Sequence, residues 1–206
     1  MDKLVNEVGM TRSKADPCLF YRGQTIYIIY TDDSIVAGPN IDEIDTLIAD
    51  IRKAKLEITE EGDIADFLGI HINRREDGTI HLHQPHLIDQ ILEDLSMNQP
   101  NLEPKDTPAK SSRILLRHPK SKSYDKSFSY RSIIGKLGYL ETGSRMDIGY
   151  IAHQCARFSS DPKVEHAAAI RHVARYLAGT RDKGLILRPD SSKGLEVYVD
   201  ADFAGN

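Results

Sequence analysis

The chain has 206 residues, of which 40% are hydrophobic and 28% are charged, and its formal net charge at pH 7 is −4. These values are ordinary for a soluble globular protein with one large domain or two smaller ones. The sequence has no run of about 18 apolar residues and no apolar signal core near its start, so it predicts neither a membrane-spanning helix nor secretion.

Two acidic residues stand between two β-prone runs near the start of the chain, after ten residues that fit a brief helix. Residues 24–30, QTIYIIY, form the first run and residues 34–38, SIVAG, form the second. The pattern predicts a hairpin with Thr31, Asp32 and Asp33 at or near its turn. Asn-Gly or Asp-Gly is the usual turn sequence, so the second aspartate needs a reason other than turn formation.

The clearest helix prediction follows this hairpin. Asn40 is a good N-cap, and Glu43 stands three residues later, as in a capping box. Acidic residues precede basic ones along the segment, which matches the helix dipole. Apolar residues follow helical spacing at Ile41, Ile44, Leu47, Ile48 and Ile51.

The next segment predicts a strand, a hairpin and a helix in turn. Residues 56–60, LEITE, fit a short strand, and residues 67–84 fit a hairpin with Asp77 and Gly78 at its turn. Residues 85–97 fit a short amphipathic helix.

The second half of the chain reads as a connector followed by helices. Residues 98–127 contain four prolines and many serines and lysines, which indicates an extended connector. The last of the helices has Asp161 as its predicted N-cap and Pro162 at its first position. The predicted helices cover residues 128–142, 147–158 and 162–178, and two short strands follow within residues 184–206.

Paired carboxylates on a turn are hard oxygen ligands, which suit Mg²⁺. A divalent cation would offset the repulsion between Asp32 and Asp33 and would position phosphate oxygens for displacement. A solvated acidic turn is the alternative interpretation. The flanking strands and the following helix favour the metal site, because they would hold the two acids on a rigid scaffold.

The segment from Tyr30 to Asp33 resembles the Tyr-x-Asp-Asp motif of reverse transcriptases, and it lies between strands as in that family. Further segments, in the same order, resemble copia-type LTR retrotransposon Pol polyproteins over nearly the whole chain. The segment FLGI at 67–70 is similar to the start of the primer-grip hairpin. The segment that joins polymerase to RNase H is similar to three stretches, YRSIIGKLGYL at 130–140, SRMDIGYIAHQCARF at 144–158 and HAAAIRHVARYLAGT at 166–180. The segment YVDADFAG at 198–205 is similar to the first strand of RNase H.

The resemblance implies roles for individual residues. Asp32 and Asp33 would be catalytic carboxylates that bind Mg²⁺ or Mn²⁺, and Tyr30 would shape the nucleotide end of the site. Asp200 would be the first acid of the RNase H metal site. The primer strand would be held by Phe67, Leu68 and Gly69.

The resemblance also implies an α+β fold. It would consist of a partial reverse-transcriptase palm, made of antiparallel hairpins plus helices, then a helical connection and the first hairpin of an RNase H-like domain. The corresponding segments are a palm and thumb-like part at 1–97, an extended linker at 98–127, a helical connection at 128–182 and a truncated RNase H-like start at 183–206.

The catalytic set of the family is incomplete in this sequence. The polymerase site needs a further aspartate upstream, and the 29 residues before Tyr30 offer neither that motif nor a fingers subdomain. RNase H needs further acids after Asp200. We therefore expect a fragment of an RNA-directed DNA polymerase that is inactive alone, so its status as an enzyme stays open. The alternative is a non-catalytic nucleic-acid- or partner-binding remnant of a decayed element.

Charge is distributed unevenly along the chain. Residues 1–98 carry 9 Lys and Arg against 19 Asp and Glu, whereas residues 99–188 carry 17 against 8. An acidic part followed by a basic part is expected where one end holds cations and the other meets a polyanion, with solvated charged faces as the alternative. The resemblance implies an RNA/DNA template-primer as the partner, and a complementing fragment of the polyprotein as a further partner. It also implies a location inside the cell, in a cytoplasmic particle or the nucleus.

Histidine and cysteine offer one further candidate. His81 and His83 share a face of a predicted strand, so with His86 they invite comparison with a zinc site. No cysteine or acid completes the set at typical spacing, which favours surface histidines. Cys155 is expected in a helical core, and its distance in sequence from Cys18 favours a reducing compartment.

Overall fold

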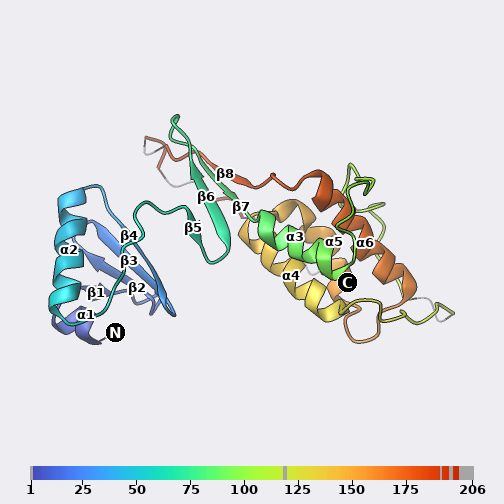
Figure 1. Cartoon of the computed structure of the whole chain (residues 1–206), viewed down its shortest axis with the longest axis horizontal. Helices are drawn as coiled ribbons and strands as arrows, with labels where there is room; N and C mark the ends of the chain where they lie inside the picture. Colours follow the sequence, from blue (N-terminus) through green and yellow to red (C-terminus); the bar gives the residue numbers. More distant parts are fainter. Residues whose placement is uncertain (1, 118–119, 191, 195–196, 200–206) are drawn as a thin grey trace. The chain divides into compact units, whose positions relative to one another are not determined.

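The computed structural model describes residues 2–117, 120–190, 192–194 and 197–199 (Figure 1). The chain forms two compact units, Met1–Leu68 and Gly69–Asn206. Both combine helices with antiparallel strands, which confirms the predicted α+β class. No helix in the described part of the chain is long and apolar enough to cross a membrane. The predicted segment borders near residues 97, 127 and 182 stay predictions.

The first unit is a four-stranded antiparallel sheet with helices against one face (Figure 1). The strands follow one another in the order β1-β2-β3-β4. Its elements are α1 (Asp2–Asn6), β1 (Thr11–Arg12), β2 (Leu19–Arg22), β3 (Thr25–Tyr30), β4 (Asp33–Ala37), α2 (Ile41–Lys53) and the short β5 (Asp66–Phe67).

The two faces of this sheet differ because side chains alternate along each strand. On one face Phe20 lies opposite Tyr27, and both are buried against Leu47 and Ile51 of α2. The other face carries a second apolar set that no helix of this unit covers; Ile26 is 36% exposed. Its members, by register, are Leu19 opposite Ile28, Tyr21 opposite Ile26, and Ile28 opposite Ile35. One face therefore forms the core and the other stays open.

Helix α2 begins where predicted, with Asn40 as its N-cap, but the cap hydrogen bond comes from Asp42 and not from Glu43 as in a capping box. The Asn40 side chain accepts a hydrogen bond from the Asp42 backbone N–H at 2.9 Å, which satisfies one of the free amides at the helix start. Asp50 of α2 forms an ion pair with Arg22 of β2 at 2.8 Å, so the helix is also joined to the sheet. The predicted strand at 56–60 is wrong: none of these residues is in a strand. Lys55 is left-handed (φ 56°) and turns the chain out of the helix into an irregular segment.

The second unit joins a small sheet to a group of packed helices. Its elements are β6 (Ile70–Arg74), β7 (Ile80–His83), α3 (Pro85–Asp94), α4 (Tyr130–Gly143), the 3-10 helix η1 (Met146–Ile148), α5 (Gly149–Ala156), α6 (Val164–Gly179) and β8 (Leu185–Leu187). Strands β6 and β7 form the predicted hairpin: Gly78 is left-handed (φ 79°), and Asp77 accepts the Thr79 backbone N–H at 3.0 Å.

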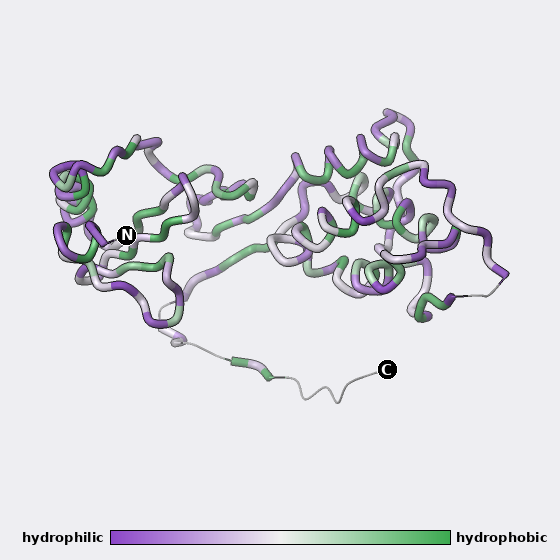
Figure 2. Tube along the Cα trace, turned by 90° about the horizontal axis from the view of Figure 1, so that it is seen from below, coloured by the Kyte–Doolittle hydropathy of each residue, from purple (hydrophilic) through white to green (hydrophobic). Residues whose placement is uncertain are grey.

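The helices of this unit enclose the larger hydrophobic core. Helix α3 packs against α4 and α6, and α5 packs against the same pair. Figure 2 shows hydrophobic stretches recurring along these helices between hydrophilic ones. Ile88, Ile133 and Ile170 have no exposed surface, and Cys155 is buried among them as predicted. The described parts of residues 98–127 contain no helix or strand of their own, and Tyr124 enters this core.

The predicted start of the last helix is wrong by two residues. Helix α6 begins at Val164, with Lys163 rather than Asp161 as its N-cap. Lys163 forms an isolated antiparallel bridge with Ser123, and the Pro162 carbonyl accepts the Tyr124 backbone N–H at 3.3 Å. These contacts keep residues 162–163 extended, so the helix cannot begin at the proline.

Strand β8 adds to the β6–β7 hairpin by pairing antiparallel with β7, Leu82 opposite Leu185. Gly184 precedes it, and a Cβ at this position would lie 2.0 Å from the Leu82 carbonyl oxygen. Only glycine allows the two backbones to come this close. Of the second strand predicted within 184–206, the described residues 197–199 are not in a strand, and the remainder lies outside the described residues.

Candidate metal and nucleic-acid site

The acidic turn lies at the tip of the β3–β4 hairpin. Tyr30 and Asp33 are directly opposite each other, so Thr31 and Asp32 form a two-residue turn. Thr31 has a φ of 53°, which is unusual for a β-branched residue. Left-handed backbone at such a residue costs free energy and is concentrated at functional sites. The hairpin prediction is confirmed, with Asp32 in the turn and Asp33 as the first residue of β4.

Both carboxylates are available to a ligand. Asp32 and Asp33 are exposed, and neither carboxylate forms a hydrogen bond or an ion pair with another residue that the structure describes. Tyr30 is 57% exposed beside them. By the alternation of the strands, Tyr30 and Asp33 belong to the open face of the sheet, in line with Ile28 and Ile35. The apolar open face therefore ends at the acidic tip.

The structure brings together some of the predicted site residues and not others. Tyr30, Asp32 and Asp33 share one tip. A separate turn holds the predicted primer-strand residues, in which Leu68 (φ 52°) and Gly69 (φ 73°) are both left-handed, as the central residues of a type I′ turn must be. Half-buried Phe67 precedes them in β5, and Asp200 lies outside the described residues. The division between the two units falls inside this turn.

Comparison with known proteins decides the family. The family described as reverse transcriptase (RNA-dependent DNA polymerase) matches residues 1–111, more than half of the chain. The chain belongs to the reverse transcriptase family.

Several relatives of this reverse transcriptase chain are retrotransposon Pol polyproteins of the copia type, as the motifs predicted. It is 32% identical over 207 residues to the retrovirus-related Pol polyprotein from transposon RE2 of Arabidopsis thaliana, covering 97% of the chain and 14% of that protein. The Pol polyprotein from transposon TNT 1-94 of Nicotiana tabacum is 27% identical, covering 100% of the chain and 16% of that protein. A putative transposon Ty5-1 protein of Saccharomyces cerevisiae is 29% identical, with 98% and 65% covered. No solved structure matches the chain.

The basic excess of the second unit is partly neutralised within the reverse transcriptase chain itself. Lys136 pairs with Asp94 at 3.0 Å, and Arg181 pairs with Asp89. Arg171 lies over the Phe128 ring, 5.1 Å from its centre. Such cations are already engaged, so the charge available to a polyanion is smaller than the sequence count indicates.

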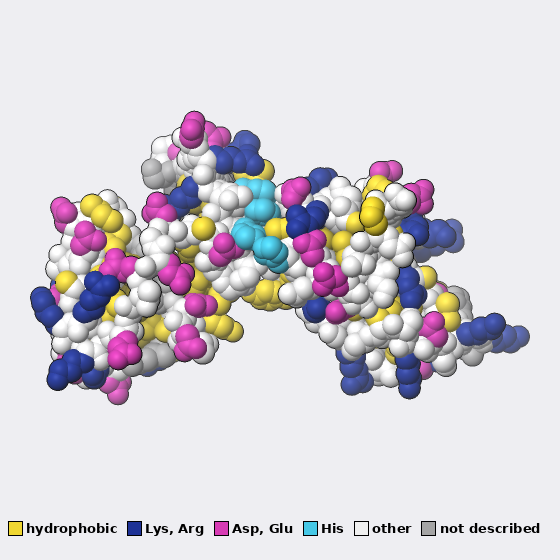
Figure 3. Space-filling view, in the orientation of Figure 1, with side chains coloured by type: hydrophobic (Ala, Val, Ile, Leu, Met, Phe, Trp, Pro, Cys, Tyr) yellow, Lys and Arg dark blue, Asp and Glu magenta, His cyan; other side chains and the backbone are white. Residues whose placement is uncertain are grey.

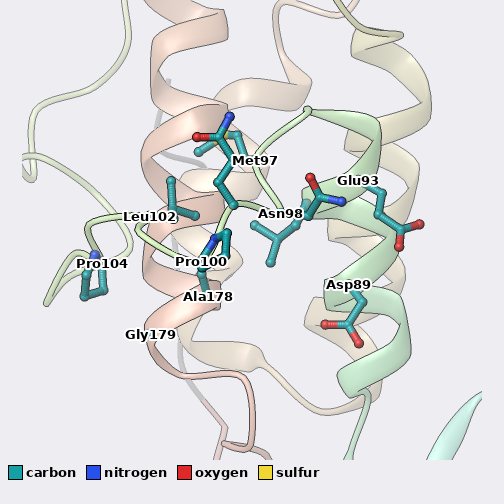
Figure 4. Close-up of a pocket in the computed structure, with 11 residues that line it drawn as sticks. Asp89, Glu93, Met97, Asn98, Pro100, Leu102, Pro104, Ala178 and Gly179 are labelled. Carbon is teal, nitrogen blue, oxygen red and sulfur yellow. The ribbon is translucent and has the colours of Figure 1, made fainter.

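A pocket of about 410 Å³ opens between α3, the segment after it and the end of α6 (Figure 4). Asp89 and Glu93 line one side from α3, and Met97, Leu102 and Ala178 line the other. Arg181 donates to Asp89 at 2.7 Å, which lowers the pKa of this carboxyl through the hydrogen bond. The pocket thus offers one acid that is engaged and one on the next turn of the same helix, and we assign it no catalytic role.

The histidines gather more closely than the sequence predicted (Figure 3). His81 and His83 stack on each other, and His71 of β6, which no sequence signal singled out, lies between His83 and His86. Strand register brings His71 in, because it is the direct partner of His83. The described residues nevertheless contain no group of three or more His, Cys, Asp or Glu that could hold a metal ion. The zinc interpretation is therefore not supported.

A second set of residues that the sequence did not reveal surrounds Arg145, whose side chain is 1% exposed. Its guanidinium donates to both carboxylate oxygens of Asp147 at 2.9 Å and to the carbonyl and hydroxyl of Thr180 at 3.0 and 2.8 Å. Tyr176 donates its hydroxyl to Asp147 at 2.6 Å. Burial acts to raise the pKa of Asp147, but the hydrogen bonds from Arg145 and Tyr176 outweigh it and hold that pKa below its ordinary value. This network joins η1 to the end of α6.

Proposed function

We propose that this chain is the segment of a retrotransposon RNA-directed DNA polymerase that supplies two carboxylates, Asp32 and Asp33, to the polymerase centre. One observation carries the proposal: both acids stand exposed and unengaged at a two-residue hairpin tip, at the end of an open sheet face. A two-residue hairpin turn requires a positive φ at its first central residue whatever its role, so the carboxylates without partners, rather than the left-handed Thr31, set this turn apart from a merely structural one.

The donor set fits a hard divalent cation. Mg²⁺ is commonly held by one or two carboxylates with substrate phosphates and water filling the other positions, and Mn²⁺ accepts the same oxygen donors. When bound, the cation would supply charge neutralisation and orientation of phosphate oxygens. Asp32 and Asp33 would hold it, and Tyr30, opposite Asp33, would form the side of the site that meets the nucleotide. Two protein ligands give weak binding.

The described residues bring no third acid to these two. In a two-metal mechanism every ligand contributes to holding both cations, so the pair alone is insufficient. We infer that the chain does not extend a primer by itself and that a complementing part of the polyprotein supplies the missing carboxylate. The chain covers 14–16% of the plant Pol polyproteins, which leaves ample sequence in those relatives for such a part.

The template-primer would be an RNA/DNA duplex, contacted at the turn formed by Phe67, Leu68 and Gly69 and by unpaired cations of the second unit. Asp200 would begin an RNase H metal site, and the protein would act inside the cell, in a particle or the nucleus. The second candidate function is a non-catalytic nucleic-acid- or partner-binding remnant, which the net positive charge of residues 99–188 favours.

Two measurements test the proposal. Mn²⁺ binding, followed by the loss of the free-ion electron paramagnetic resonance signal, is expected for the wild type and should be abolished by Asp32→Asn combined with Asp33→Asn. Asp63→Asn, a change at another exposed acid of the same unit, is the matched control. Equal Mn²⁺ binding by the wild type and the double variant would refute the metal site.

Primer extension on an RNA template then separates the two functions. We expect no extension by the chain alone, and binding to an RNA/DNA hybrid that weakens steeply as salt rises. Mg²⁺-dependent extension that Asp33→Asn abolishes would show that the pair is sufficient. Hybrid binding without any Mn²⁺ binding would favour the non-catalytic remnant.

A further inference from the structure

A second pocket, of about 640 Å³, lies within the second unit and shares no residue with the pocket in Figure 4. It is bounded by the end of the connector, the first turn of α4 and the residues just before α6. Three serines, three aromatic residues, Lys126 and Arg131 make up most of its lining. Many of these side chains donate hydrogen bonds, which indicates a ligand that accepts them.

The buried side of this pocket is aromatic and firmly held. Tyr124, Phe128 and Tyr130 are each 8% exposed or less, and the ring centres of Tyr124 and Phe128 are 5.0 Å apart. The Tyr124 hydroxyl accepts the Phe128 backbone N–H at 2.5 Å, and the Tyr130 hydroxyl donates to the Cys155 carbonyl at 2.9 Å. A site whose walls are already fixed loses little conformational entropy when a ligand binds.

The two cations of the lining are not neutralised by ion pairs. Lys126 and Arg131 are exposed, and neither forms an ion pair with a carboxylate in the part of the chain that the structure describes. Arg131 donates from Nε to the Ser159 carbonyl at 3.1 Å, so within that part of the chain both terminal nitrogens of its guanidinium remain available. Guanidinium and ammonium groups are the side-chain donors that proteins use most against phosphate oxygens.

The acids near these cations are engaged by other groups. Asp161, the one acid in the lining, pairs with Lys163 at 2.9 Å and with Arg117 at 3.3 Å. Asp125, next in the chain to one of the two cations, accepts the Ser127 backbone N–H at 3.1 Å. The pocket is therefore better suited to an anion than to a cation.

Unengaged hydroxyl groups complete the lining. Ser123, Ser129 and Ser160 are exposed, and their hydroxyls form no hydrogen bond with another described residue. Ser129 directly precedes α4, yet its side chain makes no cap hydrogen bond. Serine hydroxyls commonly donate to phosphate oxygens of nucleic acids, alongside lysine and arginine.

We propose that this pocket is a contact site for the phosphate backbone of a nucleic acid, in which Lys126 and Arg131 each neutralise a phosphate and the serine hydroxyls donate to its oxygens. The site rests on the proposed function, since it would be the place where the RNA/DNA duplex meets the second unit. A polymer is assigned rather than a small anion, because Lys122, beside Ser123, extends the unpaired cations of the described residues beyond the pocket lining.

The salt dependence of hybrid binding by the full chain tests the site. Each phosphate contact contributes about 0.9 to the slope of log K against log salt, so Lys126→Gln combined with Arg131→Gln should reduce the magnitude of the slope by about 1.8. Fluorescence anisotropy of a labelled RNA/DNA hybrid between about 50 and 200 mM salt measures the slope. Phosphate contacts carry no sequence information, so hybrids of two different sequences should give the same reduction.

The matched control is Lys183→Gln combined with Arg188→Gln. Both residues are exposed, neither forms an ion pair with another described residue, and both come after α6, whereas the pocket residues come before it. This control should leave the slope close to that of the wild type. An unchanged slope in the pocket variant, with hybrid binding by the wild type, would overturn this site alone. Absence of wild-type hybrid binding at low salt would overturn the site together with the proposed nucleic-acid partner.

A second measurement needs no substitution. When the wild type is acetylated by a succinimidyl ester and analysed by mass spectrometry, the hybrid should slow the modification of Lys126 several-fold and leave that of Lys183 unchanged. Equal rates at Lys126 with and without saturating hybrid would overturn the site even if the pocket variant failed to fold. Equal protection of Lys126 by inorganic triphosphate alone would overturn the assignment of a polymer.

Discussion

Replacing Arg145 by methionine tests whether the buried network between η1 and α6 stabilises the second unit. The change keeps an unbranched side chain but removes four hydrogen bonds, two to Asp147 and two to Thr180. Breaking a buried ion pair from one side costs about 3–5 kcal/mol, because the other charge is left unpaired. The Asp147 side chain is 40% exposed, so water compensates in part and the lower end, about 3 kcal/mol, applies.

For a unit of this size such a loss lowers the melting temperature by roughly 10 °C. Differential scanning calorimetry of the full chain measures it, with circular dichroism at 222 nm following the helices. Arg131→Met is the matched control, since the Arg131 guanidinium donates from Nε to the exposed Ser159 carbonyl at 3.1 Å, and it should cost less than about 1 kcal/mol.

The reasoning would be refuted if Arg145→Met were no more destabilising than the control. A double variant sharpens the result. Adding Asp147→Leu to Arg145→Met removes the orphaned charge, so the pair should be less destabilised than the sum of the two single changes. Strict additivity would mean that the two side chains do not stabilise the fold as an ion pair.

Three further outcomes are expected. Gly184→Ala should destabilise the second unit by about 1–3 kcal/mol in urea unfolding, because the added Cβ clashes with β7. Gly135→Ala is the control and should be neutral or stabilising, since a Cβ there meets nothing within 4 Å. Equal effects of the two changes would contradict the close approach at Gly184. Asn40→Ala should cost about 1 kcal/mol in unfolding of the first unit and Asn40→Asp almost nothing, and a silent Asn40→Ala would remove the capping role. Since the pKa of Asp147 is lowered in the folded state, its contribution should be complete above about pH 4 and be lost below it; urea midpoints of Asp147→Asn should therefore depend less on pH between 5 and 2 than those of the wild type.

Features of this fold that rest on neighbouring residues could be predicted, and features that rest on distant pairing could not. Asn40 and the Asp77-Gly78 turn act through backbone groups within two or three residues, so their sequence signals sufficed. The start of α6 depends on a bridge to Ser123, 40 residues earlier, and the cluster position of His71 depends on register with His83. No periodicity carries that information.

The residues of the candidate site and the strands around it divide in the same way into those that could be predicted and those that could not. The hairpin tip was predicted because two apolar runs flank the acids in sequence, and Tyr30, Asp32 and Asp33 are adjacent in the chain. Strands β1 and β2 escaped prediction because each is short and gains its stability from the next strand in the sheet. No sequence signal marked Arg145 as buried, because arginines are seldom buried without a partner and its partner Thr180 is 35 residues away.

The close approach at Gly184 and the exposed acids at the hairpin tip give a way to read copies of this sequence within a genome. Any coding change at Gly184 adds a side chain that the Leu82 carbonyl cannot accommodate, so a lineage that keeps glycine there while varying elsewhere is under selection for the folded protein. Changes at Asp32 or Asp33 leave the core untouched, because both are exposed. Copies that retain Gly184 but lose the acids would therefore encode a protein that still folds but has lost its metal-binding carboxylates. Copies that vary at both positions would have lost both the fold and the carboxylates.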